Sequence, residues 1–370
     1  MNKVTRAAEN FIGPEETIAG VEPYGQGIIH DTYLVKLNNG AEPFILQRVN
    51  TQVFTEPAAI MHNLRLICEH MQKVMQAGAS RIDADWQMVQ SIAAPDGEDF
   101  FIDADGVFWR ALSFIREAIP LERVSGPNEA REAGRALGVF HFLASDLDPE
   151  LLHDTLPGFH NIEHYLEHYD EVSGRGMEAG EAAGFCREFV AHRRRWAPVL
   201  EEARRREILQ ARIIHGDPKI NNIMVDRRTG RAVSIIDLDT VMSGLVHYDI
   251  GDCLRSCCNT LGEETLEFSA VRFDLKLCAS VLRGYAGAAH RFLTGADFDF
   301  LYDAIRLIPF ELGLRFYTDF LEGNTYFKVS RSDQNLDRAV VQFKLVESIE
   351  EQEKEIRAVI AECRASCSAA

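Results

Sequence analysis

The sequence predicts an α+β fold with two lobes, an antiparallel β-rich lobe followed by a mainly helical one. The chain has 370 residues, more than one compact domain usually holds. Apolar and polar residues alternate with the period of strands in the first part of the chain, whereas from about residue 127 apolar residues recur at the spacing of a helix face. We therefore expect a β-rich lobe over residues 1–116 and a helical lobe over residues 117–370.

Strands joined by turns are expected in the first lobe. Residues 28–37 and 42–49 alternate on either side of an Asn-Gly turn, which is typical of a β-hairpin. A helix is predicted over 56–77, and further strand-like runs follow at 86–94, 98–103 and 107–115. Together these patterns predict a small antiparallel sheet accompanied by one helix.

Long helical patterns dominate the second lobe. They begin near residue 127 and recur near 181–208, 264–290, 299–322 and 336–362. Two short β runs between residues 212 and 237 interrupt them, and the connection between the lobes is expected near Phe114 to Pro120.

Composition and charge narrow the classes of partner. The net charge of −18 argues against a nucleic-acid partner, because phosphate binding needs a field of the opposite sign. The chain has neither an apolar run of about 18 residues nor the apolar core of a signal peptide at its start, so we expect a cytoplasmic protein without a membrane partner. The eight cysteines show no paired C-x-x-C spacing, and reduced thiols are expected.

The segment RIIHGDPKINNIMVD, residues 212–226, places polar residues between two apolar runs. Charged side chains are costly to desolvate in such a setting, so they should have partners or a chemical role. The runs NIMVD and RAVSIIDLD flank a turn, and a hairpin there would bring Asp217, Asn222 and Asp237 to one end of a sheet. Carboxylate and amide oxygens are ligands that Mg²⁺ prefers, often together with substrate phosphates.

Phosphoryl transfer requires a carboxylate that accepts a hydroxyl proton, oxygen ligands for Mg²⁺ and a cation near the moving group. Asp217 would be the base and Lys219 the cation, while Asn222 and Asp237 would bind the metal. His215 is interpreted as a structural hydrogen-bonding residue, because Asp217 already fills the role of base. Asp239 could be a second metal ligand or a turn residue, and a supporting role beside the metal site is favoured.

The H-G-D-x-x-x-x-N spacing, followed by Asp237 after a strand, resembles the aminoglycoside phosphotransferase and choline kinase superfamily, whose fold is like that of protein kinases. The segments GDPKINNIMVD, IIDLDTVMSGL, YDIGDCLR, PFILQRVNTQVF, PGFHN, FELGLRFYTDFLEGNTYFK and NLDRAVVQFKLVESIE are similar to those of the N-acetylhexosamine 1-kinase group. The resemblance runs from about residue 25 to residue 350. It implies ATP and Mg²⁺ as cofactors, with Asp217 as the base and Asn222 and Asp237 as metal ligands.

Nucleotide binding is assigned to Gly25, Gly27 and Arg48. The two glycines precede a strand, as a loop covering the phosphates would require, although an ordinary β turn explains a G-x-G equally well. Protein kinases place a lysine on the third strand against the phosphates, and here Gln47 or Arg48 must take that place. Arg48 is preferred because a guanidinium can bind phosphate with two donors, while the alternative is a surface arginine on an edge strand.

The resemblance also implies an acceptor. The related group phosphorylates the anomeric hydroxyl of N-acetylglucosamine or N-acetylgalactosamine, and Arg315, Tyr326 and His30 match positions near the sugar. The family often reads G-H-I-N-D-T where this chain has GIIHDT, residues 27–32, so the acceptor stays open to an aminoglycoside, an amino alcohol or another hexose. Asp249 resembles an acid that braces the catalytic loop.

The wider expectation is a monomer or weak homo-oligomer whose ligands are ATP and a small sugar. The alternative from another class is a non-catalytic nucleotide-binding protein, which the uncertainty at Gln47 and Arg48 favours.

Overall fold

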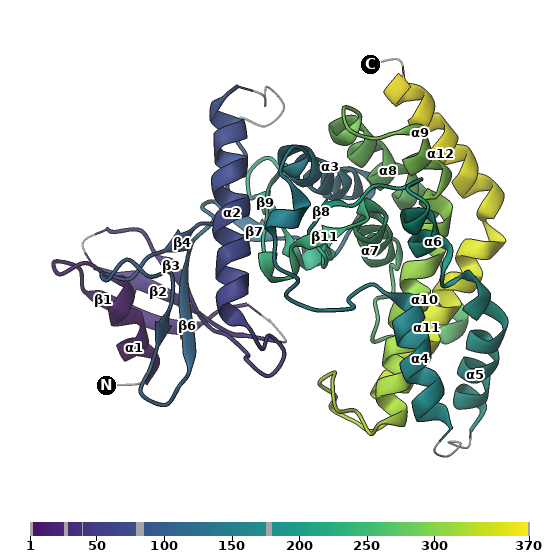
Figure 1. The fold of residues 1–370 in the computed structure, drawn as a ribbon, viewed down its shortest axis with the longest axis horizontal. Coiled ribbons are helices and arrows are strands. Elements are labelled where there is room, and N and C mark those ends of the chain that lie inside the picture. The colour runs from purple at the N-terminus through teal and green to yellow at the C-terminus, as the bar shows by residue number, and fades with distance from the viewer. Residues whose placement is uncertain (1–2, 26–28, 39, 79–84, 175–179, 369–370) are drawn as a thin grey trace.

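The structure is a computed structural model that describes residues 3–25, 29–38, 40–78, 85–174 and 180–368. A small β-rich lobe and a larger helical lobe lie on either side of the long helix α2 (Figure 1). The α+β architecture predicted from the sequence is confirmed, with β-strands concentrated in the first part of the chain and helices in the second.

The first lobe is built on one antiparallel sheet with the strand order β1-β2-β3-β6-β4, and β5 pairs with the outer part of β6. The strands are β1 (Ile18–Pro23), β2 (Asp31–Leu37), β3 (Phe44–Arg48), β4 (Ser91–Ile92), β5 (Phe101–Ile102) and β6 (Phe108–Ser113). The predicted β2–β3 hairpin is confirmed by its antiparallel register, whereas β1 was not predicted. The strand-like run at 86–94 forms only the two residues of β4.

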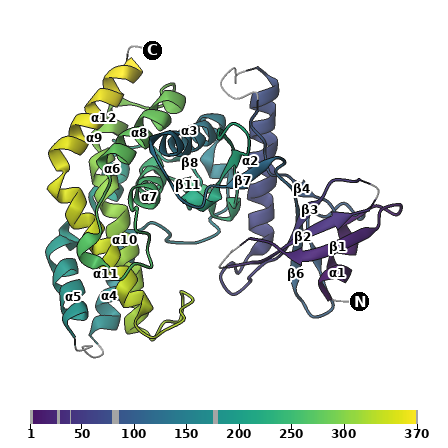
Figure 2. The same cartoon turned by 180° about the vertical axis from the view of Figure 1, so that it is seen from behind.

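The two faces of this sheet have different coverings. The N-terminal helix α1 (Lys3–Ala8), followed by the 3-10 turn Glu9–Phe11, packs against the buried side chains of Phe44, Leu46 and Trp109. Side chains alternate along a strand, so Gln47, which follows Leu46, and Arg110, which follows Trp109, lie on the opposite face. Figure 2 shows from behind that α1 lies on the side of the sheet away from the helical lobe.

Helix α2 (Pro57–Gln76) agrees with the helix predicted over 56–77 and joins the two lobes through its packing. Proline at its first position suits a helix start, because that position has no intrahelical use for an N–H group. Its buried residues Ile60, Leu64 and Ile67 belong to the same apolar core as Leu137 of α3. The helix thus connects the first lobe to the core of the second.

The helical lobe contains ten α-helices in the part of the chain that the structure describes. They are α3 (Pro127–Ala144), α4 (Ile162–Ser173), α5 (Glu181–Arg193), α6 (Val199–Arg205), α7 (Val246–Cys258), α8 (Leu275–Ala289), α9 (Gly295–Asp299), α10 (Leu301–Leu321), α11 (Gln334–Glu351) and α12 (Glu353–Ser368), where the short α9 is a single turn leading into α10. The helix predicted over 264–290 begins only at Leu275, because the Asp274 side chain caps it by accepting from the N–H groups of Lys276 and Leu277 at 2.9 and 3.0 Å. The pattern at 181–208 divides into α5 and α6, and α4 was not predicted.

Helices α3 and α8 approach each other closely through glycines. A Cβ at Gly134 would lie 2.0 Å from the carbonyl oxygen of Val281, and a Cβ at Gly284 would lie 2.0 Å from that of Arg131. Any larger residue would therefore separate the helices. This contact fixes α3 beside the elements that carry the site.

Two small sheets interrupt the helices. The strands β7 (Ala118–Pro120), β9 (Ile223–Asp226) and β10 (Ala232–Ile235) form one, and β8 (Arg212–Ile214) pairs with β11 (Met242–Gly244) in the other. The predicted hairpin between residues 222 and 239 is confirmed by the β9–β10 pairing. It places the loop after β8 next to the segment after β10.

Two further predictions concern the whole chain. All eight cysteines are free thiols, as expected. No helix within the described ranges is both long and apolar enough to cross a bilayer.

Candidate active site

The loop from His215 to Asn222 follows β8 and is fixed by a buried carboxylate. Asp249 of α7 accepts hydrogen bonds from the backbone N–H groups of His215 and Gly216 at 2.6 and 2.9 Å, and from Nε2 of His141 at 2.8 Å. Burial alone would raise the pKa of Asp249, but these donors hold it below its ordinary value. The prediction that Asp249 braces this loop is confirmed.

Gly216 allows the loop to pass close to the opposite segment. Its φ is 85°, and a Cβ there would lie 2.5 Å from the carbonyl oxygen of Thr240. Both the left-handed backbone and the close approach require glycine.

His215 connects the loop to the strand that precedes Asp237. Its Nδ1 accepts from the N–H of Asp217 at 3.3 Å, so Nε2 is the donor to the carbonyl oxygen of Ile236 at 3.0 Å. The ring is fully buried and has both nitrogens engaged. The interpretation of His215 as a structural hydrogen-bonding residue is confirmed.

Asp217, Lys219 and Asn222 lie together. The Lys219 ammonium forms an ion pair with the Asp217 carboxylate, and the amide nitrogen of Asn222 donates to the backbone oxygen of Asp217 at 2.8 Å. Burial lowers the pKa of Lys219, but Asp217 and Asp237 together raise it above its ordinary value. Lys219 is therefore a permanent positive charge beside Asp217.

Asp237 follows β10 with a left-handed backbone, φ 68°, and its side chain is exposed. The N–H of the preceding Ile236 donates to the carbonyl oxygen of Asn222 at 2.8 Å, which places Asp237 beside the loop of Asp217. No cluster of three or more His, Cys, Asp and Glu able to hold a metal occurs in the described ranges. One carboxylate and one amide suit a Mg²⁺ ion that arrives with nucleotide phosphates, since such ions need few protein ligands. The donor set of Asn222 and Asp237 therefore fits.

The face of the sheet on which Arg48 lies differs from the prediction. Arg48 lies on the face of the sheet that carries α1, and it is a half-exposed ion-pair partner of Asp31. Gln47 lies on the opposite face, and its amide contacts Thr32 at 3.1 Å. This placement contradicts the choice of Arg48 over Gln47, because strand alternation turns Arg48 away from the helical lobe. Of the two glycines, Gly25 has a φ of 73°, and Gly27, like Ile28, lies outside the described residues.

The inward face of the sheet, opposite α1, carries a different cation, Arg110. Arg110 of β6, beside Gln47 in register, donates from Nε to the Gln47 side chain at 2.9 Å. Its other end lies 2.7 and 2.8 Å from the two carboxylate oxygens of Asp239. Arg110 was not predicted as a site residue, since a single arginine in an apolar strand carries no distinctive pattern.

His30 completes this contact between the lobes. Its Nδ1 accepts from the N–H of Asn50 at 3.0 Å, so Nε2 donates to Asp239 at 2.6 Å. Although burial raises the pKa of Asp239, Arg110 and His30 hold it well below its ordinary value. Asp239 is thus engaged by two side chains of the first lobe, in keeping with the supporting role favoured for it. His30 is buried here, and its contact with a substrate stays a prediction.

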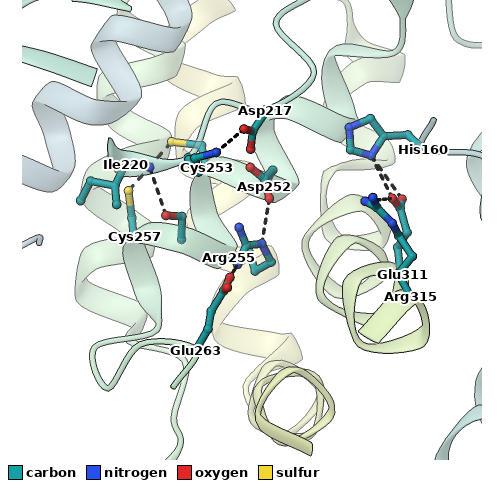
Figure 3. Close-up of polar contacts among 12 residues, drawn as sticks. His160, Asp217, Ile220, Asp252, Cys253, Arg255, Cys257, Glu263, Glu311 and Arg315 are labelled. Atoms are coloured by element: carbon teal, nitrogen blue, oxygen red, sulfur yellow. Dashed lines mark hydrogen bonds and ion pairs between the residues drawn. The ribbon is translucent and has the colours of Figure 1, made fainter. Parts of the chain in front are cut away.

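The proposed acceptor side contains a second group of charges from α4, α10 and their connections. His160 donates from Nε2 to the backbone oxygen of Gly216 at 2.9 Å, and its Nδ1 lies 3.2 Å from Glu311 (Figure 3). Burial lowers the pKa of His160, but Glu311 outweighs this effect and raises it. His160 and Glu311 were not assigned from the sequence, although the segments containing them entered the family resemblance.

Arg315 lies 3.8 Å from Glu311 and is surrounded by aromatic rings. Its guanidinium carbon is 5.1 Å from the ring centres of both Phe159 and Tyr165, and 5.9 Å from that of Tyr326. Burial lowers the pKa of Arg315, but the neighbouring Tyr165, Glu311 and Tyr326, with a smaller contribution from Asp217, raise it above its ordinary value. The structure thus brings Arg315 and Tyr326 together near the candidate base.

Asp319 positions the loop that carries Tyr326. Its carboxylate accepts from the N–H groups of Tyr326 and Phe327 at 2.8 and 2.9 Å, while the Tyr326 side chain is 56% exposed. The ring is therefore held by its backbone but remains accessible.

Residues 20–275 match the model of the phosphotransferase enzyme family. An aminoglycoside phosphotransferase from Alicyclobacillus acidocaldarius superposes with a TM-score of 0.60 at 12% identity, covering 99% of this chain and 96% of that chain. A microcompartment-associated aminopropanol kinase gives 0.58 at 16% identity, with 95% and 97% coverage. The GDP complex of aminoglycoside 2'-phosphotransferase-IIIa gives 0.55 at 15% identity, with 98% and 99% coverage. At these identities the structural likeness establishes the shared kinase-like fold.

Proposed function

Because the chain belongs to the phosphotransferase enzyme family, we propose that it transfers the γ-phosphoryl group of ATP to the anomeric hydroxyl of an N-acetylhexosamine. The family membership supports a small-molecule phosphotransferase with an alcohol acceptor. The convergence of Asp217, Lys219 and Asn222 on one braced loop is the observation that carries the proposal.

The residues of the site divide into four roles. Asp217 accepts the proton of the attacking hydroxyl, and Lys219 supplies positive charge where the phosphoryl group moves. Asn222 and Asp237 would hold Mg²⁺, which neutralises charge on the nucleotide phosphates when bound. Asp249 and His215 fix the loop so that the base keeps its orientation, since proton transfer depends on a distance of about 3 Å.

The acceptor is proposed from the residues around Arg315. A guanidinium beside Tyr165 and Tyr326 can donate to hydroxyl or carbonyl oxygens of a neutral sugar, while the rings pack on its apolar faces. The same positive charge opposes a cationic acceptor. We therefore favour an N-acetylhexosamine over an aminoglycoside or an amino alcohol.

Those cationic acceptors form the second candidate, and the names of two similar structures favour it. One is an aminoglycoside phosphotransferase and the other an aminopropanol kinase. The charge at Arg315 and the names of these structures thus point to different acceptors, which a direct assay separates.

The assay incubates purified protein with Mg²⁺, ATP or GTP, and a panel of N-acetylhexosamines, hexoses, amino alcohols and aminoglycosides. We expect a sugar 1-phosphate from N-acetylglucosamine or N-acetylgalactosamine. Phosphorylation of the cationic acceptors alone would replace the acceptor assignment, and no transfer to any acceptor would refute the kinase proposal.

The Asp217→Ala variant, purified in parallel, tests the catalytic assignment. It should lose about 10²- to 10⁴-fold in kcat, the usual contribution of a positioned base, while binding ATP as the wild type does. Equal turnover by variant and wild type would show that the activity comes from a contaminant or from another residue.

A further inference from the structure

One face of helix α7 follows the catalytic loop residue by residue. Asp249, Asp252 and Ser256 are spaced three and four apart, which places them in a row on a helix. Asp249 holds the loop at His215 and Gly216. About two turns further along the helix, the hydroxyl of Ser256 accepts from the N–H of Ile220 at 3.1 Å. Asp252 lies between these two contacts and therefore opposite Asp217 to Lys219.

Charge effects support this position. Burial lowers the pKa of Lys219, while Asp217 and Asp237, with a smaller contribution from Asp252, raise it. Asp252 also makes a small contribution to the raised pKa of His160, after burial and Glu311. Figure 3 draws Asp252 on α7 beside the loop that carries Asp217, and both carboxylates act on Lys219. Asp252 is thus part of the surroundings of the reacting groups.

The two oxygens of Asp252 have different environments. Oδ1 accepts from Nε of Arg255 at 2.7 Å, and Arg255 also pairs with Glu263. Oδ2 is buried and has no hydrogen-bond partner among the residues that the structure describes. A buried carboxylate oxygen without a donor is unfavourable and rare in native proteins. Its position beside the proposed base indicates that a ligand supplies the donor.

We propose that Oδ2 of Asp252 accepts a hydrogen bond from the substrate that is phosphorylated. The donor is the group on the carbon adjacent to the one that carries the reacting hydroxyl. This inference rests on the proposed function. Asp217 would engage the reacting hydroxyl while Asp252 holds its neighbour, and two such contacts fix the orientation of the acceptor. In an N-acetylhexosamine phosphorylated at C1, the neighbouring donor is the acetamido N–H on C2. The site would then prefer acceptors with adjacent donors.

The substitution Asp252→Asn is a directed probe because Arg255 fixes the orientation of the side chain. The amide oxygen must stay on the Arg255 donor, which turns the amide nitrogen to the position of Oδ2. In the variant the amide N–H of Asn therefore faces the N–H of the sugar, and two donors cannot form a hydrogen bond with each other. With N-acetylglucosamine, kcat/KM should fall about 10- to 100-fold, the range of a lost hydrogen bond to a charged group.

A deoxy acceptor separates this contact from a structural effect. 2-Deoxyglucose has no donor on C2, so the Asp252→Asn substitution should change the kcat/KM for this sugar by less than about threefold. The wild type should prefer N-acetylglucosamine over 2-deoxyglucose by about tenfold or more in kcat/KM. Calorimetric titration of N-acetylglucosamine in the presence of Mg²⁺ and ADP should show the same loss in acceptor affinity. Binding of ATP should not change.

Glu263→Gln is the matched control, because it removes the other carboxylate of Arg255 and leaves Oδ2 as it is. It should keep the discrimination between the two acceptors. Equal losses for both acceptors in Asp252→Asn, or a higher Mg²⁺ requirement with unchanged acceptor affinity, would overturn the inference while leaving the kinase proposal standing. A wild type that phosphorylates no sugar would refute the proposed function itself.

Discussion

Replacing Arg110 by methionine tests the contact that joins the two lobes. The guanidinium lies 2.7 and 2.8 Å from the carboxylate oxygens of Asp239, and the side chains are only 1% and 4% exposed. Methionine preserves much of the apolar stem but removes the charge. Asp239 would then remain buried, with its contact to His30 at 2.6 Å but without the guanidinium.

The expected magnitude follows from the burial of the pair. Removing one partner of a buried ion pair costs about 3–5 kcal/mol, because the other charge stays desolvated. His30 still donates to Asp239, so we expect a loss near 3 kcal/mol in the free energy of unfolding. The matched variant Arg48→Met breaks an ion pair on the same sheet whose side chains are 52% and 43% exposed, and it should cost about 1 kcal/mol or less.

Urea unfolding followed by tryptophan fluorescence measures both variants, and Trp109 on β6 is adjacent to Arg110 in the chain. The folded pKa of Asp239 is lowered, so the contribution of the pair is present above the unfolded value of about 3.9 and is lost as the pH falls below it towards the folded value. Measurements at pH 7 should therefore show the full difference between the variants. Equal losses for Arg110→Met and Arg48→Met would refute this reasoning.

Two further predictions concern stability. Gly134→Ala should destabilise the protein by about 1–3 kcal/mol, because its Cβ would lie 2.0 Å from the Val281 oxygen. The control Gly287→Ala on α8 has no atom within 4 Å of its Cβ and should be neutral or stabilising. Thermal unfolding of both variants measures this difference, and equal effects would contradict the close packing. The folded pKa of His160 is raised, so its pairing with Glu311 should stabilise the protein fully below the unfolded value of about 6.5 and be lost as the pH rises through the folded pKa. The difference in unfolding free energy between wild type and His160→Gln should accordingly shrink from pH 6 to pH 9, and a constant difference would argue against a charged His160.

The candidate site residues that are close together along the chain could be predicted from their spacing. Asp217, Lys219 and Asn222 lie within six residues, and a short hairpin brings the following segment back to them. Local spacing and turn chemistry are sufficient for such an arrangement, since few other conformations connect two short strands. Asp249 followed from the family resemblance, and its bonds to the loop agree with it.

The inward cation of the sheet could not be chosen in the same way. Gln47 and Arg48 are neighbours in sequence, and a shift of one residue exchanges the two faces of a strand. Packing of Phe44, Leu46 and Trp109 against α1 selected the register that turns Arg48 outwards. Arg110 then took the inward position from a strand more than sixty residues away in sequence.

The sequence by itself thus determined the α+β class and the order of the candidate catalytic groups, because periodicity and spacing are local properties of the chain. Only the tertiary structure decided which distant charges meet. His160 reaches Glu311 across 151 residues, and Asp252 has its position opposite Asp217 because α7 packs along the loop. The physical reason is that a buried charge is stabilised by whichever partners the packing of the core brings within hydrogen-bond distance, and no short segment encodes that choice.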